Sequence, residues 1–310
     1  KMKGSIKNTF GALFVIIIIL LFVKVFITNW TQIESFQFDL NIPLYFFSTL
    51  IFIFVIFLWG AFWNLLLRDL NYKKLSFHEG FKIQAQAWFG KYLPGKAGVI
   101  GIKLYIGKEK GIDSTTIGIS TIYENVFQII AAFSVSVPIL FYYSLKELGE
   151  NPFLYQILPL LLIVGLLIFI HPRVFFYFTN LGLRLIKKQP ISKKYFITSG
   201  QIVKYVILYS IGMITTGIAF FLFIRSITPL SIEYLIPTIG IFNFAGIIGL
   251  LAIFVPAGLG VREGIIVLLL QAYMPLEIVI FISILSRLWT TVADGILGIY
   301  VLFIKLFNKK

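Results

Sequence analysis

A few charged residues lie where the surrounding sequence is almost entirely apolar. Glu124, Arg287 and Asp294 each fall inside a long hydrophobic run. A charge within a membrane-spanning segment costs at least about 2.5–3.5 kcal/mol on insertion scales, so it needs a partner or a hydrated pathway. Two explanations follow for Glu124 and Arg287. They pair with each other and hold helices together, or they line a hydrated pathway in which Arg287 receives an anionic group.

The spacing of these residues is helical. Arg287 and Asp294 are seven positions apart, which is two helical turns, so they share one face. Glu124 and Gln128 are four positions apart and also share a face, with Asn125 beside them. We expect Glu124 and Asp294 to balance or gate a cavity lined by basic side chains.

Two breaks rich in proline and glycine carry the other candidate residues. The first reads Pro94-Gly95-Lys96-Ala97-Gly98 and the second Pro256-Ala257-Gly258-Leu259-Gly260, so both have Pro first and Gly fifth. Glycine-rich helix starts present backbone N–H groups to anions, and an arginine adds a fork that matches phosphate. Arg262 and Glu263 follow the second break, and Lys103 follows the first.

We therefore predict a site for a phosphate-bearing group, flanked by hinges. The predicted substrate-binding residues are Lys96, Lys103, Arg262, Arg287, Glu124, Glu263 and Asp294, and the predicted hinge residues are Pro94, Gly95, Gly98, Pro256, Gly258 and Gly260. The alternative is that Lys96 and Lys103 belong only to a positively charged loop.

Composition requires the membrane as the solvent for these elements. Of the 310 residues 59% are hydrophobic and 13% charged, whereas a soluble domain is about half apolar and about a quarter charged. This excludes a soluble enzyme, a nucleic-acid-binding module and a disordered regulator. Cysteine is absent, and His78 and His171 lie far apart, so we expect no disulfide, metal site or cofactor. No nucleotide-binding or hydrolase motif is found.

The hydrophobic runs predict an all-α polytopic membrane bundle in a single domain, residues 1–310. Six runs are long enough to span a bilayer: residues 10–28, 43–67, 115–144, 153–170, 201–224 and 276–303. The stretches 77–106 and 233–273 contain the two breaks. Because lipid cannot satisfy the backbone groups that Pro and Gly free, we interpret both as re-entrant hairpins, with two short spans each as the alternative.

Loop charge sets the orientation. Lys and Arg are concentrated in residues 68–113 and 171–199, while residues 29–42 and 145–152 carry mainly acids. By the positive-inside rule both termini lie in the cytoplasm and the protein lies in the cytoplasmic membrane. One hairpin then enters the membrane from each side.

Two segments of the chain correspond as an internal repeat. Glu124 stands 30 residues after Pro94, and Arg287 stands 31 residues after Pro256. The predicted topology starts one unit outside and the other inside, which is the inverted-repeat plan of many secondary transporters. The predicted units are residues 43–144 and 201–303.

These motifs resemble a known family. Residues 92–98, residues 255–264, Glu124, Arg287 and Gly295 are similar to the lysylphosphatidylglycerol synthase/flippase transmembrane-region family, and the resemblance covers nearly the whole chain. It implies an integral membrane protein with a lipid-related role. In some members the region is fused to an aminoacyl transferase or glycosyltransferase domain and is credited with moving the lipid product between leaflets.

The sequence departs from that family in ways that bear on its substrate. Where members often have Glu-Arg in the third span, this chain has Glu124-Asn125, and Lys103 lies near a position where they often have Arg. No soluble catalytic domain accompanies the spans, so we expect no aminoacyl-lipid synthase activity.

Together these observations predict a protein that moves an anionic, phosphate-bearing lipid or a polyprenyl-phosphate-linked glycan between leaflets. The alternatives are an intramembrane lipid-modifying transferase, with Glu124 or Glu263 as base, and a non-catalytic membrane partner of a separate glycosyltransferase or lipid synthase. We expect no nucleic-acid partner.

Overall fold

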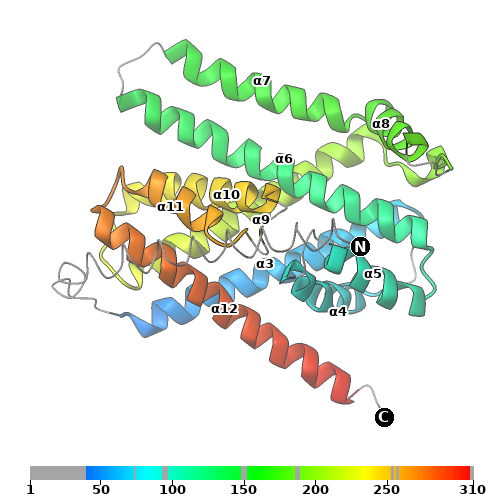
Figure 1. The fold of residues 1–310 in the computed structure, drawn as a ribbon, viewed down its shortest axis with the longest axis horizontal. Helices are drawn as coiled ribbons and strands as arrows, with labels where there is room; N and C mark the ends of the chain where they lie inside the picture. The colour runs from blue at the N-terminus through cyan, green and yellow to red at the C-terminus, as the bar shows by residue number, and fades with distance from the viewer. Residues whose placement is uncertain are drawn as a thin grey trace, which may run out of the picture. The chain divides into compact units, whose positions relative to one another are not determined.

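The computed structural model describes residues 40–72, 75–92, 97–147, 152–185, 189–252, 255 and 258–307. All regular structure in these ranges is helical, which confirms the predicted fold class (Figure 1). The α-helices are α3 (Ile42–Asp69), α4 (Phe77–Trp88), α5 (Ala97–Glu109), α6 (Ser114–Glu147), α7 (Pro152–Ile170), α8 (Pro172–Leu185), α9 (Ser199–Arg225), α10 (Leu235–Leu251), α11 (Val261–Leu270) and α12 (Leu276–Phe307). Short 3-10 turns precede several of them: η1 (Phe89–Tyr92), η3 (Lys193–Tyr195) and η4 (Ile232–Tyr234).

Five helical segments in the described part of the chain are long and apolar enough to cross a membrane. They are Ile42–Asp69, Ser114–Tyr143, Lys193–Arg225, Ile232–Leu251 and Leu276–Phe303. Four of them match predicted spans closely, and α7 coincides with the predicted span at residues 153–170. The predicted span at residues 10–28 lies outside the described residues. Large apolar side chains such as Phe46, Phe54 and Ile299 are exposed, as lipid-facing residues are. The protein is therefore an integral membrane protein.

The two broken stretches are unequal. The first contains two short helices of similar length, α4 and α5, and η1 directly follows α4. In the second, η4 and α10 form a segment of 20 residues that is long enough to span, while α11 has only 10 residues. The second stretch is thus not a pair of equal short arms. The re-entrant path of both stretches stays a prediction, and the motif residues Pro94, Gly95, Lys96 and Pro256 lie outside the described residues.

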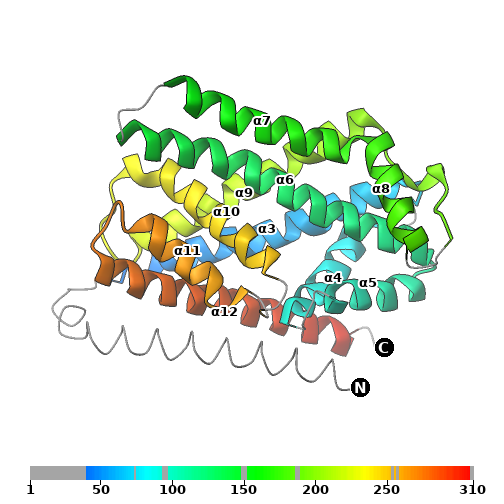
Figure 2. The ribbon, with the colours of Figure 1, turned by 45° about the horizontal axis from the view of Figure 1, so that its top comes forward.

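By its contacts the chain divides into two compact units. Unit 1 comprises Lys1–Ile53, Lys91–Gly98 and Thr216–Lys310, and unit 2 comprises Phe54–Gly90 and Val99–Thr215. In unit 2, α6 and α7 run side by side, and α8 follows α7 directly (Figures 1 and 2). Aromatic rings fill the core of this unit: Trp59 stacks on Tyr209 with ring centroids 5.1 Å apart, and Phe127 stacks on Tyr205 at 5.3 Å.

Unit 1 packs α10, α11 and α12 together (Figure 2). Trp289 of α12 is fully buried, and its ring centroid lies 4.9 Å from that of Phe223 of α9. Its indole N–H donates to Thr49 Oγ1 of α3 at 3.1 Å. Helix α9 approaches α10 at Gly217, where a Cβ atom would lie 2.6 Å from Ile239 Cα. These contacts hold α12, with Arg287 and Asp294, against α9.

Helix α8 was not predicted. Its residues were expected only as part of the basic segment 171–199, in which Arg173 and Arg184 alternate with apolar residues. The structure shows that they form a helix of 14 residues instead.

Candidate functional site

In unit 1 the second break positions a helix start. Gly258 and Gly260 have φ angles of 65° and 79°, a backbone region that favours glycine. A Cβ atom on Gly258 would also lie 2.8 Å from Gly249 Cα, so the turn packs directly on α10. The Gly260 N–H donates to Glu263 Oε2 at 2.6 Å and so caps α11. The predicted hinge glycines therefore orient the first turn of α11, which carries Arg262.

Two ion pairs fix the neighbouring charges. Arg287 Nη2 of α12 lies 2.9 Å from Glu263 Oε1 of α11. Lys91 Nζ of η1 lies 2.7 Å from Asp294 Oδ2, two turns further along the same face of α12. The carboxylate side chains are only 7% exposed, whereas Arg287 and Lys91 are 23% and 26% exposed. The bases therefore reach the edge of the protein while the acids stay inside.

Arg262 lacks a complete set of hydrogen-bond acceptors among the described residues. Its Nε and Nη2 atoms are buried and have no hydrogen-bond acceptor among the described residues. Its guanidinium lies 4.6 Å from the ring centroid of Phe242, a cation–π contact that leaves these donors unused. The charges of Arg287, Glu263 and Asp294 also interact electrostatically with the Arg262 guanidinium.

We call this group the basic cluster. It comprises Lys91, Arg262, Glu263, Arg287 and Asp294. Three cations face two carboxylates, so the cluster carries one net positive charge. Such an excess at low water content favours binding of an anion, and guanidinium groups bind phosphate with two parallel N–H donors.

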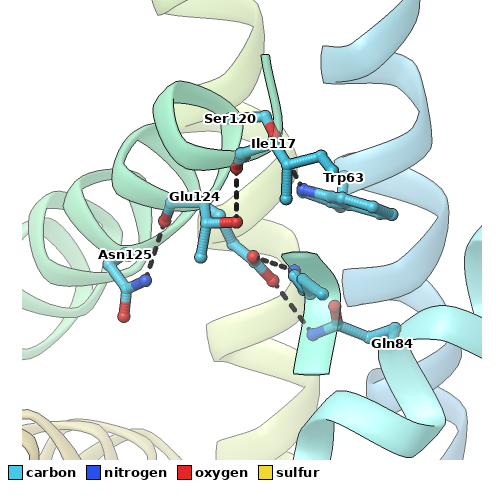
Figure 3. A network of polar contacts seen from close by, with 8 residues as sticks. Trp63, Gln84, Ile117, Ser120, Glu124 and Asn125 are labelled. Carbon is cyan, nitrogen blue, oxygen red and sulfur yellow. Dashed lines mark hydrogen bonds and ion pairs between the residues drawn. The ribbon is translucent and has the colours of Figure 1, made fainter. Parts of the chain in front are cut away.

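A second buried group of charges lies in unit 2. Glu124 of α6 forms an ion pair with Lys103 of α5, and Gln84 of α4 donates to Glu124 Oε1 at 2.9 Å. Lys103 Nζ lies 4.3 Å from the ring centroid of Trp63 of α3. Trp63 Nε1 in turn donates to Ser120 Oγ at 3.1 Å, and Figure 3 shows how the Trp63, Gln84 and Glu124 side chains converge from three helices.

This second group differs from the basic cluster in its charge. Lys103 is 0% exposed and Glu124 is 3% exposed, and their charges balance. A balanced, enclosed pair has no excess charge with which to attract a phosphate group. The contacts of Lys103 thus favour a structural role for it.

The structure brings together four of the residues predicted for the site, Arg262, Glu263, Arg287 and Asp294. Glu124 and Arg287, whose mutual pairing the sequence left open, each have a carboxylate or cationic partner within their own unit. Lys96 lies outside the described residues. Within those residues no group of three or more His, Cys, Asp or Glu side chains is arranged to hold a metal ion.

Sequence reasoning missed Lys91, Gln84 and Trp63 as members of these networks. Lys91 was counted only among the loop bases, although it lies within an apolar stretch, as Lys103 does. Its position within an apolar stretch was the signal that could have identified it as a buried, paired base. Nothing in the sequence identifies Asp294, which lies 203 positions away, as its partner.

Comparison with known proteins identifies a family for the chain. The family described as the lysylphosphatidylglycerol synthase transmembrane region matches residues 10–298, which is most of the chain. A search of the curated proteins finds no significant match. The resemblance drawn from the two glycine-containing breaks is confirmed, and the chain belongs to the lysylphosphatidylglycerol synthase transmembrane-region family, a lipid-related family of membrane proteins.

Proposed function

We propose that this protein moves a lipid with an anionic, phosphate-bearing head group between the two leaflets of the membrane. The observation that carries the proposal is the buried guanidinium of Arg262, whose Nε and Nη2 atoms have no acceptor among the described residues. A buried donor without an acceptor costs free energy, and more so when the group is charged. A phosphate oxygen would supply the acceptor and offset that cost.

The charge of the basic cluster supports the same ligand. Its one excess positive charge is balanced by one negative charge on a bound head group. Arg287 and Lys91 are partly exposed, so a head group can approach their cationic groups while each still faces its carboxylate partner. A neutral solute would gain nothing from this arrangement. Membership of a lipid-related family agrees with a lipid as the bearer of the phosphate.

The proposal includes an orientation of the protein in the membrane. We place it in the cytoplasmic membrane with both termini in the cytoplasm, on the basis of the loop charges. The lipid moves down its gradient or with a coupled ion. The two glycine-containing breaks supply the hinges.

The proposal is tested by leaflet exchange in vesicles that contain the purified protein and fluorescent lipids. The variant is Arg262→Gln, which removes the charge and most of the donor fork but keeps much of the length. Loss of charged hydrogen bonds worth about 1.5–3 kcal/mol should slow exchange of phosphatidylglycerol by about 10- to 100-fold. The control is Arg225→Gln, because Arg225 is exposed at the end of α9 and undergoes the same change in charge.

Three results decide the matter. Slow exchange in Arg262→Gln and normal exchange in Arg225→Gln, with both variants as thermally stable as the wild type, support the proposal. Full exchange in a folded Arg262→Gln protein contradicts it. Mass spectrometry of the recovered lipid is the third measurement, since a covalently altered head group would identify a lipid-modifying transferase instead.

A further inference from the structure

Helix α8 presents an apolar stripe in which Phe178, Leu181 and Leu185 are exposed. Val174, Phe178, Leu181 and Leu185 are spaced four, three and four positions apart, so they lie along one face. Phe178 is 49% exposed and Leu185 is 78% exposed. A short helix with such a face is too short to span a bilayer and is typical of helices that lie at its surface.

Basic residues border this stripe. Arg173 and Arg184 are eleven positions apart, which is three helical turns, so both lie on one line beside the apolar face. Tyr177 lies between them and is 62% exposed. Arginine and tyrosine at the edge of an apolar face are the groups that contact lipid head groups while neighbouring side chains enter the acyl region.

The orientation of α8 is fixed by its other face. Phe175 is buried, and its ring centroid lies 4.7 Å from that of Tyr123 of α6. Asn180 exchanges two hydrogen bonds with the backbone of Ile191, at 2.6 Å and 3.2 Å. Because these contacts hold the opposite face of α8 against the protein, the apolar stripe points outward in the folded protein.

The position of α8 directly after α7 indicates that the membrane surface lies next to it. Helix α7 has 19 residues, about 28 Å of helix, which is close to the thickness of the hydrocarbon core. Its side chains Leu161 and Ile168 are about 60% exposed. Helix α7 ends at Ile170 and α8 begins at Pro172, so α8 starts where the chain leaves the hydrocarbon.

The charge of this segment selects among the surfaces that could cover the stripe. Residues 171–199 contain six bases and no acid: Arg173, Arg184, Lys187, Lys188, Lys193 and Lys194. A second copy of the same segment would be repelled by this charge. An anionic lipid surface attracts it, by about 1 kcal/mol for each base near the surface.

We propose that α8 lies along the membrane and binds the anionic head groups of the leaflet at which α7 ends. Arg173 and Arg184 contact the head groups, and the stripe of Val174, Phe178, Leu181 and Leu185 enters the acyl region. This surface does not depend on the transport proposed above and would persist in a protein that moves no lipid.

The absence of cysteine from the chain allows a direct test. Single cysteines introduced by Phe178→Cys, Leu185→Cys and Glu109→Cys are labelled with an environment-sensitive fluorophore, and the protein is reconstituted in vesicles that contain lipids with quenching groups on their acyl chains. Glu109 is an exposed residue at the end of α5 and serves as the polar control. We expect strong quenching of the labels at positions 178 and 185 and little quenching at position 109.

The charge dependence is measured on the Leu185→Cys protein in vesicles with and without phosphatidylglycerol. Quenching should be stronger with the anionic lipid and should weaken at high salt. Adding Arg173→Gln and Arg184→Gln should reduce the preference for anionic lipid about fivefold for each arginine removed, while Arg225→Gln should leave it unchanged.

Several outcomes would overturn the proposal. The label at position 185 could be as accessible to water as the label at position 109, or its quenching could be equal in anionic and zwitterionic vesicles. Protection of the label in detergent that rises with protein concentration would instead identify a second copy of the chain as the occupant.

Discussion

The ion pair between Lys103 and Glu124 is enclosed so completely that its contribution to stability can be separated from its contribution to function. Removing one partner leaves a single charge buried among Trp63, Gln84 and apolar helices, which typically costs about 3–5 kcal/mol. We expect Lys103→Met and Glu124→Gln each to lower the free energy of unfolding by about this amount. The double variant leaves no unpaired charge at this position and should recover much of the loss.

Thermal unfolding of the three variants in detergent provides the measurement. Lys204→Met is the matched control, because Lys204 pairs with Asp69 at the surface and its side chain is 42% exposed. Exposed pairs contribute about 1 kcal/mol or less. A double variant as unstable as the sum of the two single variants would show that Lys103 and Glu124 stabilise the protein independently.

At this scale the sequence predicted which residues carry buried charge but not which of them meet. Glu124, Arg287 and Asp294 are conspicuous because a charge in an apolar run must be explained. Lys103, the partner of Glu124, lies 21 positions away in the sequence, and Lys91, the partner of Asp294, lies 203 positions away. Only helix packing brings residues so distant in sequence together, and residue types and local spacing do not predict that packing.

The start of α4 allows a prediction about pH. Glu79 and Ser76 form a capping box, and Lys110 Nζ donates to Glu79 Oε1 at 2.9 Å. The hydrogen bond from Lys110 and then that from the Ser76 backbone lower the pKa of Glu79 from 4.5 to about 2. A carboxylate with a lowered pKa in the folded state stabilises it above the unfolded pKa. That contribution is lost as the pH falls from 4.5 towards 2.

Thermal unfolding between pH 6 and pH 3 compares the wild type with Glu79→Gln and Lys110→Met. The wild type should lose stability progressively below about pH 4.5, and Glu79→Gln should lose less, because it has no carboxylate to protonate at the cap. In Lys110→Met the pKa of Glu79 should lie closer to 4.5, so the loss should be smaller there too. Identical pH profiles for all three proteins would contradict the role of the capping box.

Elements were predicted with unequal success for a physical reason. Long apolar runs have one interpretation in a membrane protein, and α3, α6, α7, α9 and α12 begin and end within a few residues of the predicted spans. Helix α8 mixes arginine with apolar residues, so a search for hydrophobic runs passes over it. Its 3.6-residue periodicity was the signal that would have found it.

On the scale of the whole chain, one arrangement occurs twice. A long helix, two shorter helices and a second long helix follow one another in α3 to α6 and again in α9 to α12. In each series an ion pair joins the second shorter helix to the closing long helix: Lys103 with Glu124, and Glu263 with Arg287. The paired helices correspond and the charges are reversed. This correspondence agrees with the repeat of residues 43–144 and 201–303, but the repeat and its inverted orientation both stay predictions.

The inverted orientation requires that α6 carry the chain from the cytoplasm to the outside. Helix α6 has 34 residues, about 51 Å of helix, so its two ends lie beyond opposite sides of a hydrocarbon core about 30 Å thick. The residues before α6 are rich in Lys, and residues 145–152 after it carry Glu147 and Glu150 against Lys146. By the positive-inside rule we predict that the first end is cytoplasmic.

Single cysteines again give the measurement, because the chain has none of its own. An impermeant thiol reagent should label Lys146→Cys in intact cells, and it should label Glu109→Cys and Lys194→Cys only after the membrane is permeabilised. In the predicted topology α9, whose 27 residues span about 40 Å, returns the chain to the outside after residues 171–199. The second series of helices would then start on the side opposite to the first. Labelling of Glu109→Cys from outside would show that residues 68–113 are not cytoplasmic. It would exclude the predicted inverted repeat, which requires them to be.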